Sequence, residues 1–145
     1  MIPARDDLLR AACDARLRSH SPYSRFRVGA ALLCRNGRVV TGTNVENASL
    51  GLSMCAERVA VGRAIAEGER EFVAIAICAD GRAPTPPCGA CRQVLLGFGG
   101  DLEVILGGEN GPDGPVKSFR LRDLLPEAFL DFTAGTPVAN DQEGA

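Results

Sequence analysis

Residues 53–96 decide the fold, and they read SMCAERVAVGRAIAEGEREFVAIAICADGRAPTPPCGACRQVLL. The stretch begins with a helical pattern over 54–67, for which Ser53 is a suitable N-cap. An apolar run over 72–79 follows, and a second helical pattern covers 89–96. An apolar run of this length predicts a strand buried on both faces near the centre of a sheet. The order helix, strand, helix therefore predicts an α/β protein.

The residues on either side of this stretch extend the same pattern. Asn36-Gly37 between two apolar segments is typical of a two-residue hairpin turn. We therefore expect a three-layer α-β-α sandwich with a five-stranded mixed sheet and helices on both faces. The further elements predicted are a helix over 6–18, strands over 25–34, 38–43, 102–106 and 116–119, and a helical turn over 121–125.

The length of 145 residues predicts a single domain. We place this domain at residues 1–132, because no repeat or linker divides the sequence before that point. Residues 133–145 are rich in small and polar side chains, and we expect them to form a disordered tail.

Composition argues against a nucleic acid or a membrane as partner. The net charge is -2, no basic stripe is present, and only 5% of the residues are aromatic. The longest apolar run, 72–79, is too short to span a bilayer. The first seven residues lack the charged-then-apolar plan of a signal peptide. We therefore expect a cytoplasmic location.

Three of the six cysteines stand in two short motifs that suit a metal ion. Cys55 precedes Cys88 by 33 residues, and Cys91 follows three residues further on, where a helix begins. In a reducing compartment such cysteines favour metal binding over disulfide pairing. Structural zinc sites close with four protein ligands, whereas catalytic sites keep one position for water. The motifs therefore predict one catalytic Zn²⁺ per chain, held by Cys55, Cys88 and Cys91.

Two charged residues follow Cys55 and suit this site. Glu57 in a partly dry pocket could exchange protons with activated water and with a ring nitrogen, so we predict that it is catalytic. Arg58 lies three residues after Cys55 on the same helix side, and we expect it to hydrogen-bond the thiolates and offset their charge. An ordinary first-turn glutamate and a solvated helix arginine are the alternatives.

The cysteines also admit a purely structural interpretation. In that case a fourth, distant ligand would close the zinc site, and the candidates are His20, Cys13, Cys34 and Cys78. The last three lie in apolar segments, which predicts small core residues instead. A lone histidine in a polar loop is more often hydrogen-bonded or at the surface than a ligand.

Four sequence blocks resemble the cytidine deaminases of the small, three-cysteine, homotetrameric type. The resemblance covers about residues 4–130. The two zinc motifs carry the deaminase resemblance, and the two earlier blocks narrow it to free nucleosides. The blocks are SPYSRFRVGAAL at 21–32, NVENA at 44–48, CAER at 55–58 and PCGACRQ at 87–93.

The resemblance implies an enzyme of the hydrolase class that acts on C–N bonds in cyclic amidines. It implies deamination of cytidine and 2′-deoxycytidine to uridine and 2′-deoxyuridine, with release of ammonia, as in pyrimidine salvage. Asn44 and Glu46 would hydrogen-bond the ribose hydroxyls, and Phe26 would pack against the pyrimidine ring. The Ala56 N–H would bind a base carbonyl. Phe129 from a neighbouring subunit would close the pocket, which makes the site complete only in a homotetramer.

The sequence departs from the family pattern at Leu50, where an aromatic residue is common, and at Pro86, where a serine is frequent. Leu50 lies near a subunit contact of the family, so this departure affects how a neighbouring subunit's substrate loop would pack. Three other functions remain alternatives: deamination of another aminopyrimidine nucleoside such as a nucleoside antibiotic, editing of RNA or DNA, and a noncatalytic zinc-stabilised module.

Overall fold

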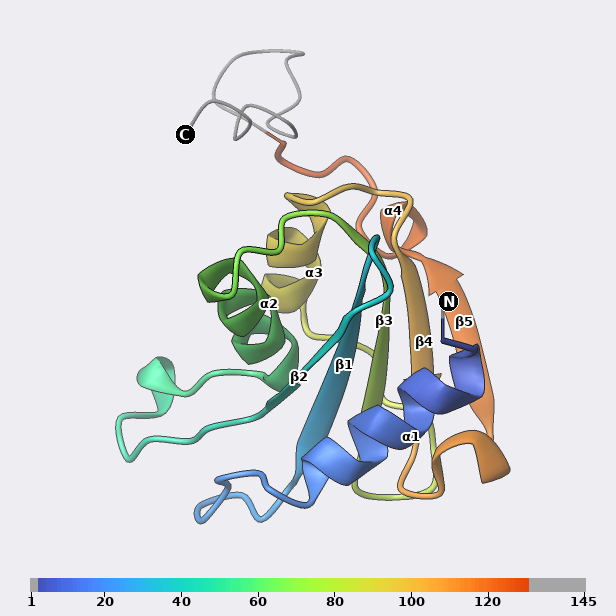
Figure 1. Cartoon of the computed structure of the whole chain (residues 1–145). Helices are drawn as coiled ribbons and strands as arrows, with labels where there is room; N and C mark the ends of the chain where they lie inside the picture. The colour runs from blue at the N-terminus through green and yellow to red at the C-terminus, as the bar shows by residue number, and fades with distance from the viewer. Residues whose placement is uncertain (1–2, 131–145) are drawn as a thin grey trace.

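The computed structural model describes residues 3–130, in which a five-stranded sheet has helices on both faces (Figure 1). The predicted tail over 133–145 and the predicted domain end at 132 lie outside this range. The elements are α1 (Arg5–Arg16), β1 (Val28–Cys34), β2 (Val39–Thr43), η1 (Leu50–Leu52), α2 (Ala56–Ala66), β3 (Phe72–Ala79), α3 (Gly89–Leu96), β4 (Glu103–Gly107), η2 (Gly111–Asp113), β5 (Val116–Arg120) and α4 (Leu121–Leu124).

The sheet is mixed, as the sequence predicts, and β3 is its central strand. The strand order is β2-β1-β3-β4-β5. Only β3 and β4 are parallel, because α3 carries the chain across between them, while the other neighbouring strands are antiparallel. Both faces of β3 are covered, which agrees with its uninterrupted apolar sequence.

The two faces of the sheet pack against different helices. On one face α1 covers a cluster in which the sheet contributes mainly small residues, among them Ala31, Ala74 and Ala76. Small side chains let α1 lie close to the strands, closest at Gly29, where a Cβ atom would lie 2.0 Å from the Ala12 carbonyl oxygen.

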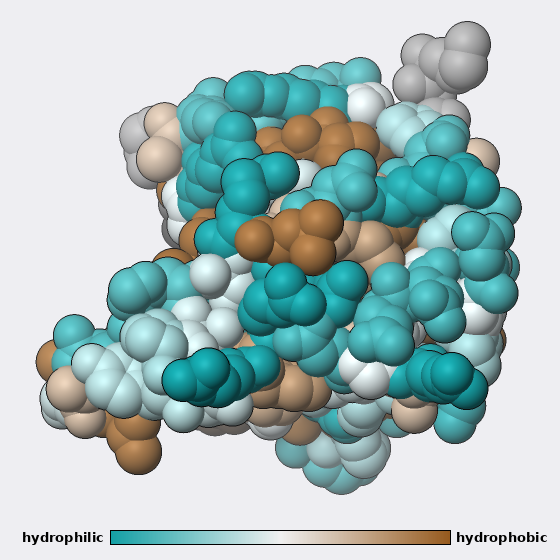
Figure 2. All heavy atoms as spheres, turned by 90° about the horizontal axis from the view of Figure 1, so that it is seen from below, coloured by the Kyte–Doolittle hydropathy of each residue, from teal (hydrophilic) through white to brown (hydrophobic). Residues whose placement is uncertain are grey.

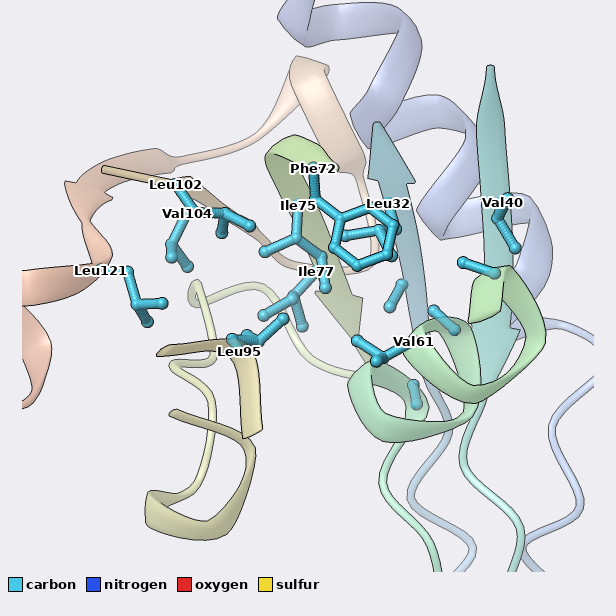
Figure 3. Close-up of a cluster of buried hydrophobic side chains, with 14 of the residues drawn as sticks. Leu32, Val40, Val61, Phe72, Ile75, Ile77, Leu95, Leu102, Val104 and Leu121 are labelled. Atoms are coloured by element: carbon cyan, nitrogen blue, oxygen red, sulfur yellow. The ribbon is translucent and has the colours of Figure 1, made fainter. Parts of the chain in front are cut away.

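The other face holds the larger cluster of buried side chains, which α2 and α3 cover (Figure 3). Ile75 and Ile77 of β3 point into it, and they alternate along the strand with Ala74 and Ala76, which face α1. Leu32 and Val104 extend it into the neighbouring strands, and Leu95 enters from α3. The predicted three-layer sandwich is therefore confirmed.

Two predicted starts were wrong for identifiable reasons. The strand predicted from residue 25 begins at Val28, because Arg25 has a left-handed backbone with φ of 57° that a strand cannot contain. The helix α2 begins at Ala56 with Cys55 at the N-cap, so Ser53 does not cap it. Instead, the Ser53 hydroxyl accepts a hydrogen bond from the Asn47 backbone N–H at 3.1 Å.

The hairpin between β1 and β2 is present, but its turn is longer than predicted. Cys34 N–H donates to the Arg38 carbonyl, which leaves three residues, 35–37, in the loop. Gly37 has φ of 94°, the left-handed position that closes three-residue hairpin loops. The helix α3 and the strand β3 have the predicted bounds, whereas α1, β4, β5 and α4 differ by one or two residues at one or both ends.

The close packing of α1 yields a stability prediction. Gly29→Ala places a methyl group against the backbone of α1 at Ala12 and Arg16, and we expect a loss of about 3 kcal/mol in the free energy of unfolding. Gly62→Ala is the matched control, because Gly62 lies on an exposed part of α2 with nothing near its Cβ position. This control should gain about 1 kcal/mol, since alanine favours the helix. Urea unfolding of both variants measures the difference, and equal stabilities would contradict the described packing.

Candidate metal centre and active site

Two helix N-termini bring three sulfur atoms together. Cys55 is the N-cap of α2, Cys88 is the N-cap of α3, and Cys91 lies in the first turn of α3. Their Sγ atoms all lie within 4.8 Å of one another, and those of Cys55 and Cys88 are 3.7 Å apart. The partial positive charge at each helix N-terminus favours the thiolate form of these side chains.

The spacing of these sulfur atoms fits a tetrahedral zinc ion. With Zn–S bonds of about 2.3 Å, two sulfurs on a tetrahedron lie about 3.8 Å apart. Within residues 3–130 this group consists of the three cysteines alone, without a fourth histidine, cysteine or carboxylate. The donor set therefore fits zinc with one position left for another ligand.

The residues considered as a fourth structural ligand lie elsewhere. His20 pairs with Val45 through its backbone in a short parallel bridge, and it is exposed. Cys34 and Cys78 are buried core residues, as predicted. Cys13 is only partly buried, and its thiol donates to the Gly108 carbonyl at 3.5 Å. Within residues 3–130, none of these four residues joins the three sulfurs as a fourth ligand, so they do not close a structural zinc site.

The ionised forms of Cys55 and Cys91 oppose each other. Hydrogen bonds from Cys91, Arg58 and Cys88 lower the pKa of Cys55 to about 5, although burial opposes this shift. The interaction with Cys55, burial and the nearby Glu57 raise the pKa of Cys91. A divalent ion among the sulfurs would remove this opposition, because a coordinated thiol loses its proton.

Arg58 supplies a positive charge next to the sulfur group. Its Nη2 donates to the Cys55 Sγ at 3.4 Å. This hydrogen bond to Cys55, together with those to Cys91, raises the pKa of the guanidinium despite partial burial. The Nε atom of Arg58 is buried and has no hydrogen-bond partner among the described residues.

Glu57 lies in the first turn of α2 and is only 4% exposed. Burial raises the pKa of its carboxyl group, and the negative charge of Cys55 acts in the same direction, against a hydrogen bond with Cys91. A carboxyl group whose pKa lies above its ordinary value can hold and release a proton nearer neutral pH. A first-turn glutamate that only interacted with the helix dipole would be exposed, which Glu57 is not.

A short backbone ladder joins the predicted ribose-binding segment to the sulfur group. Val45 and Met54 exchange two backbone hydrogen bonds, of 2.9 and 2.8 Å. Val45 also pairs with His20 on its other side. Residues 44–46 therefore lie between His20 and Met54, and Asn44 and Glu46 are joined through this ladder to the segment that leads to Cys55.

Asn44 is held by the loop that carries Phe26. Its Oδ1 accepts from the Val28 N–H at 2.9 Å and from the Ser19 hydroxyl, while its Nδ2 donates to the Phe26 carbonyl at 2.8 Å. One N–H of the Asn44 amide is not used by these contacts.

Glu46 binds the same loop two residues further along. Its Oε1 accepts from the backbone N–H groups of Tyr23 and Ser24, each at 3.0 Å, and its Oε2 accepts from the Ser24 hydroxyl. The hydrogen bonds from Ser24 lower the pKa of Glu46, so this carboxylate is ionised at neutral pH. The loop contacts of both side chains are structural, and they were not predicted.

Phe26 and Phe129, the two aromatic residues predicted to contact the substrate, are both exposed to solvent. Phe26 is 41% exposed and Phe129 is 61% exposed. The Gln93 side chain donates to the Phe129 carbonyl at 2.7 Å, which ties the end of the described chain to α3. Arg92 donates to the carbonyls of Pro87 and Leu124, both at 2.8 Å. The first of these bonds fixes the residue directly before Cys88.

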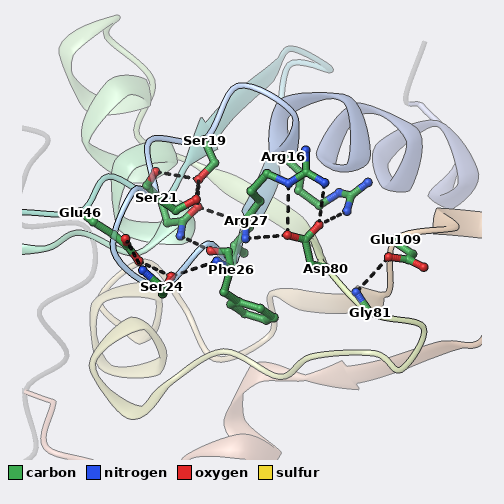
Figure 4. A network of polar contacts seen from close by, with 12 residues as sticks. Arg16, Ser19, Ser21, Ser24, Phe26, Arg27, Glu46, Asp80, Gly81 and Glu109 are labelled. Carbon is green, nitrogen blue, oxygen red and sulfur yellow. Dashed lines mark hydrogen bonds and ion pairs between the residues drawn. The ribbon is translucent and has the colours of Figure 1, made fainter.

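Sequence reasoning missed an ionic group beside the substrate loop (Figure 4). Asp80 follows the last residue of β3, and its carboxylate binds Arg16 of α1 and Arg27 of the loop. The available signal was an acidic residue at the carboxyl end of a central apolar strand, a position at which α/β proteins often place functional groups.

Comparison with known proteins agrees with this fold and site. Residues 3–107 match the family described as the cytidine and deoxycytidylate deaminase zinc-binding region. A cytidine deaminase of Halalkalibacterium halodurans is 48% identical over 126 residues, which is 86% of this chain and 93% of the relative. A cytidine deaminase of Mycobacterium tuberculosis is 49% identical over 119 residues, or 81% of this chain and 84% of that protein. A crystal structure of cytidine deaminase from Burkholderia pseudomallei has a TM-score of 0.82 at 46% identity, covering 88% of this chain and 100% of that one.

The fold and the three-sulfur group define a zinc-dependent deaminase. The chain belongs to the cytidine deaminase family, since the matched regions cover most of this chain and most of each relative. It is an enzyme that deaminates cytidine and binds zinc, and the group of Cys55, Cys88 and Cys91 fits one zinc ion per chain. In the part of the chain that the structure describes, no helix is long and apolar enough to cross a membrane.

Proposed function

We propose that the chain hydrolyses cytidine and 2′-deoxycytidine to uridine and 2′-deoxyuridine, releasing ammonia, with Glu57 as the proton carrier. The observation that carries this proposal is a buried carboxyl group next to a three-sulfur group with an open ligand position. Zinc held by the three cysteines would activate water for attack on C4 of the pyrimidine.

Glu57 has a distinct task at each stage. It accepts a proton from the attacking water and delivers it to N3 of the base. It then takes the remaining water proton from the new hydroxyl group on C4, which becomes the product carbonyl, and gives this proton to the departing amine. Water thus supplies the oxygen of the product, the hydrogen on N3 and one hydrogen of ammonia, while the other two hydrogens of ammonia come from the exocyclic amine of the substrate. Its position two residues after Cys55 and its raised pKa support this role, because a general acid and base works best near the operating pH.

Arg58 would balance the charge of the all-sulfur ligand set. Three thiolates on a divalent ion leave a net charge of about -1, which weakens the ion as a Lewis acid. A guanidinium that donates to the Cys55 sulfur draws electron density away from the metal site. We therefore assign Arg58 a role in lowering the pKa of the water that zinc would activate.

The substrate contacts are compatible with the hydrogen-bonding capacity left in the loop. Glu46 uses Oε2 for only one donor, the Ser24 hydroxyl, so this atom can also accept from a ribose hydroxyl. The second N–H of Asn44 can donate to the same sugar. Phe26 would pack against the pyrimidine, and the N–H of Ala56, at the uncapped start of α2, would bind the base carbonyl.

The active unit is proposed to be a cytoplasmic homotetramer that serves pyrimidine salvage, with one domain per chain. Exposed hydrophobic side chains support the assembly. The segment between β2 and α2 projects from the body of the protein (Figure 1), and it carries Leu50, which is 71% exposed. Figure 2 shows further hydrophobic patches among hydrophilic residues on the lower face. Phe129 would then close the pocket of a neighbouring subunit.

Replacement of the proton carrier tests the mechanism. Glu57→Gln keeps the size of the side chain but cannot carry a proton, so we expect at least about a 100-fold lower kcat with zinc retained. The measurement is the loss of ultraviolet absorbance on mixing with cytidine, together with metal analysis. Glu67→Gln, at the other end of α2, is the control and should keep full activity. A Glu57→Gln enzyme with normal turnover would exclude this carboxyl group as the proton carrier.

Replacement of Arg58 tests the charge balance separately. Arg58→Gln removes the guanidinium beside the Cys55 sulfur, and we expect about a tenfold lower kcat at full zinc occupancy. Arg63→Gln on the same helix removes an exposed arginine that binds Glu67 and should leave kcat unchanged. Unchanged turnover of the fully loaded Arg58→Gln enzyme would show that charge compensation is not needed.

A further inference from the structure

Asp80 binds Arg27 at both its backbone and its side chain. The Asp80 Oδ2 accepts from the Arg27 backbone N–H at 2.9 Å and from its Nε at 3.1 Å, and Oδ1 accepts from Nη2 at 3.2 Å. The Asp80 N–H donates in turn to the Arg27 carbonyl at 3.0 Å. Four hydrogen bonds therefore fix the residue that directly follows Phe26 (Figure 4).

We propose that Asp80 is a positioning residue for the reaction, which orients the Phe26 ring for the substrate through Arg27. This inference rests on the proposed packing of Phe26 against the pyrimidine and adds the residue that sets the place of the ring.

The backbone of Phe26 is anchored on its other sides as well. Its N–H donates to the Ser24 hydroxyl oxygen at 3.0 Å, and its carbonyl accepts from Asn44 at 2.8 Å. Ser24 is itself bound by Glu46. The anchor at Ser24 is held by Glu46 and the anchor at Asn44 is direct, so both depend on the predicted ribose-binding segment. The anchor at Arg27 depends instead on Asp80, which follows the central strand.

The exposure of the ring explains why such anchors matter. A residue buried in the core is oriented by its neighbours, but Phe26 is 41% exposed. Its direction therefore depends on the backbone that carries it. The preceding residue, Arg25, has φ of 57°, a conformation that a non-glycine residue keeps only when its surroundings hold it. Release of the Arg27 anchor would allow this segment to relax.

Asp80 is well suited to act as a fixed point. It follows the last residue of β3 and also forms an ion pair with Arg16, a buried residue of α1. Burial opposes ionisation of Asp80, but the hydrogen bonds and charge of Arg27, with the charge of Arg16, hold its pKa below the ordinary value. The carboxylate is therefore charged at neutral pH, and it joins the loop to two elements of the folded core.

The first experiment compares the kinetics of zinc-loaded Asp80→Asn and wild-type enzyme with cytidine. The variant keeps one acceptor oxygen but loses the charge that holds both arginines, and we expect KM to rise about fivefold with kcat within twofold. Glu109→Gln is the matched control. Its carboxylate accepts from the Gly81 N–H at 3.1 Å, one residue from Asp80, but has no hydrogen bond to Arg27. The control should keep the wild-type KM.

A double-mutant cycle separates positioning from a general loss of stability. In a Phe26→Ala background, Asp80→Asn should change KM by less than twofold, because the ring that it positions is absent. An equal rise in KM in both backgrounds would overturn the inference. Arg27→Ala supplies a second variant if Asp80→Asn does not fold. It leaves the pair of Asp80 and Arg16 intact and should raise KM about twofold, again only when Phe26 is present.

Amide hydrogen exchange distinguishes failure of this inference from failure of the proposed substrate contact. Residues 26–28 should exchange at least about tenfold faster in Asp80→Asn than in wild type and Glu109→Gln, without substrate. Unchanged exchange overturns the positioning role, whatever happens to KM. Faster exchange with an unchanged KM overturns its part in the reaction. If Phe26→Ala alone leaves KM unchanged, the proposed contact of Phe26 with the base is wrong.

Discussion

Two helices begin at the same point beside the sheet, and the three sulfur atoms at their N-termini constrain the rest of the active site. In the sequence, Cys55 precedes β3, whereas Cys88 and Cys91 follow it. The group therefore forms only when the central strand and both helices are in place. Close thiolates repel one another, and a divalent ion removes that repulsion. Zinc binding should therefore also stabilise the packing of α2 and α3. Arg58 lies beside Cys55, where its positive charge offsets part of the remaining negative charge.

The loop over residues 19–27, which carries Phe26, follows a different principle. It lies outside the core, and its shape depends on hydrogen bonds to its backbone rather than on burial. Asn44 and Glu46 bind it from the segment that leads to α2, and Asp80 binds it from the end of β3. The same side chains that are proposed to bind ribose thus also shape the loop that carries Phe26. Sugar recognition and placement of the ring would be coupled, because both depend on one set of contacts.

The sequence predicted the features that local patterns encode. The apolar run gave β3 with its bounds, and the cysteine spacing gave the three sulfurs that the structure brings together. The bonds of Asp80 to Arg27 join residues 53 positions apart, and no local pattern marks such a pair. The predicted start of β1 was wrong because the left-handed backbone conformation of Arg25 is uncommon for a non-glycine residue and its residue type does not indicate it.

A zinc titration of the metal-free protein, with zinc binding and cytidine turnover followed together, tests directly whether the three sulfurs hold a catalytic zinc ion. We expect one zinc ion to bind per chain and the rate of loss of ultraviolet absorbance to rise in proportion, reaching its maximum at one equivalent. Full turnover by the metal-free protein would contradict this expectation. So would the binding of one zinc ion per chain without any turnover of cytidine, because the three sulfurs would then hold only a structural metal.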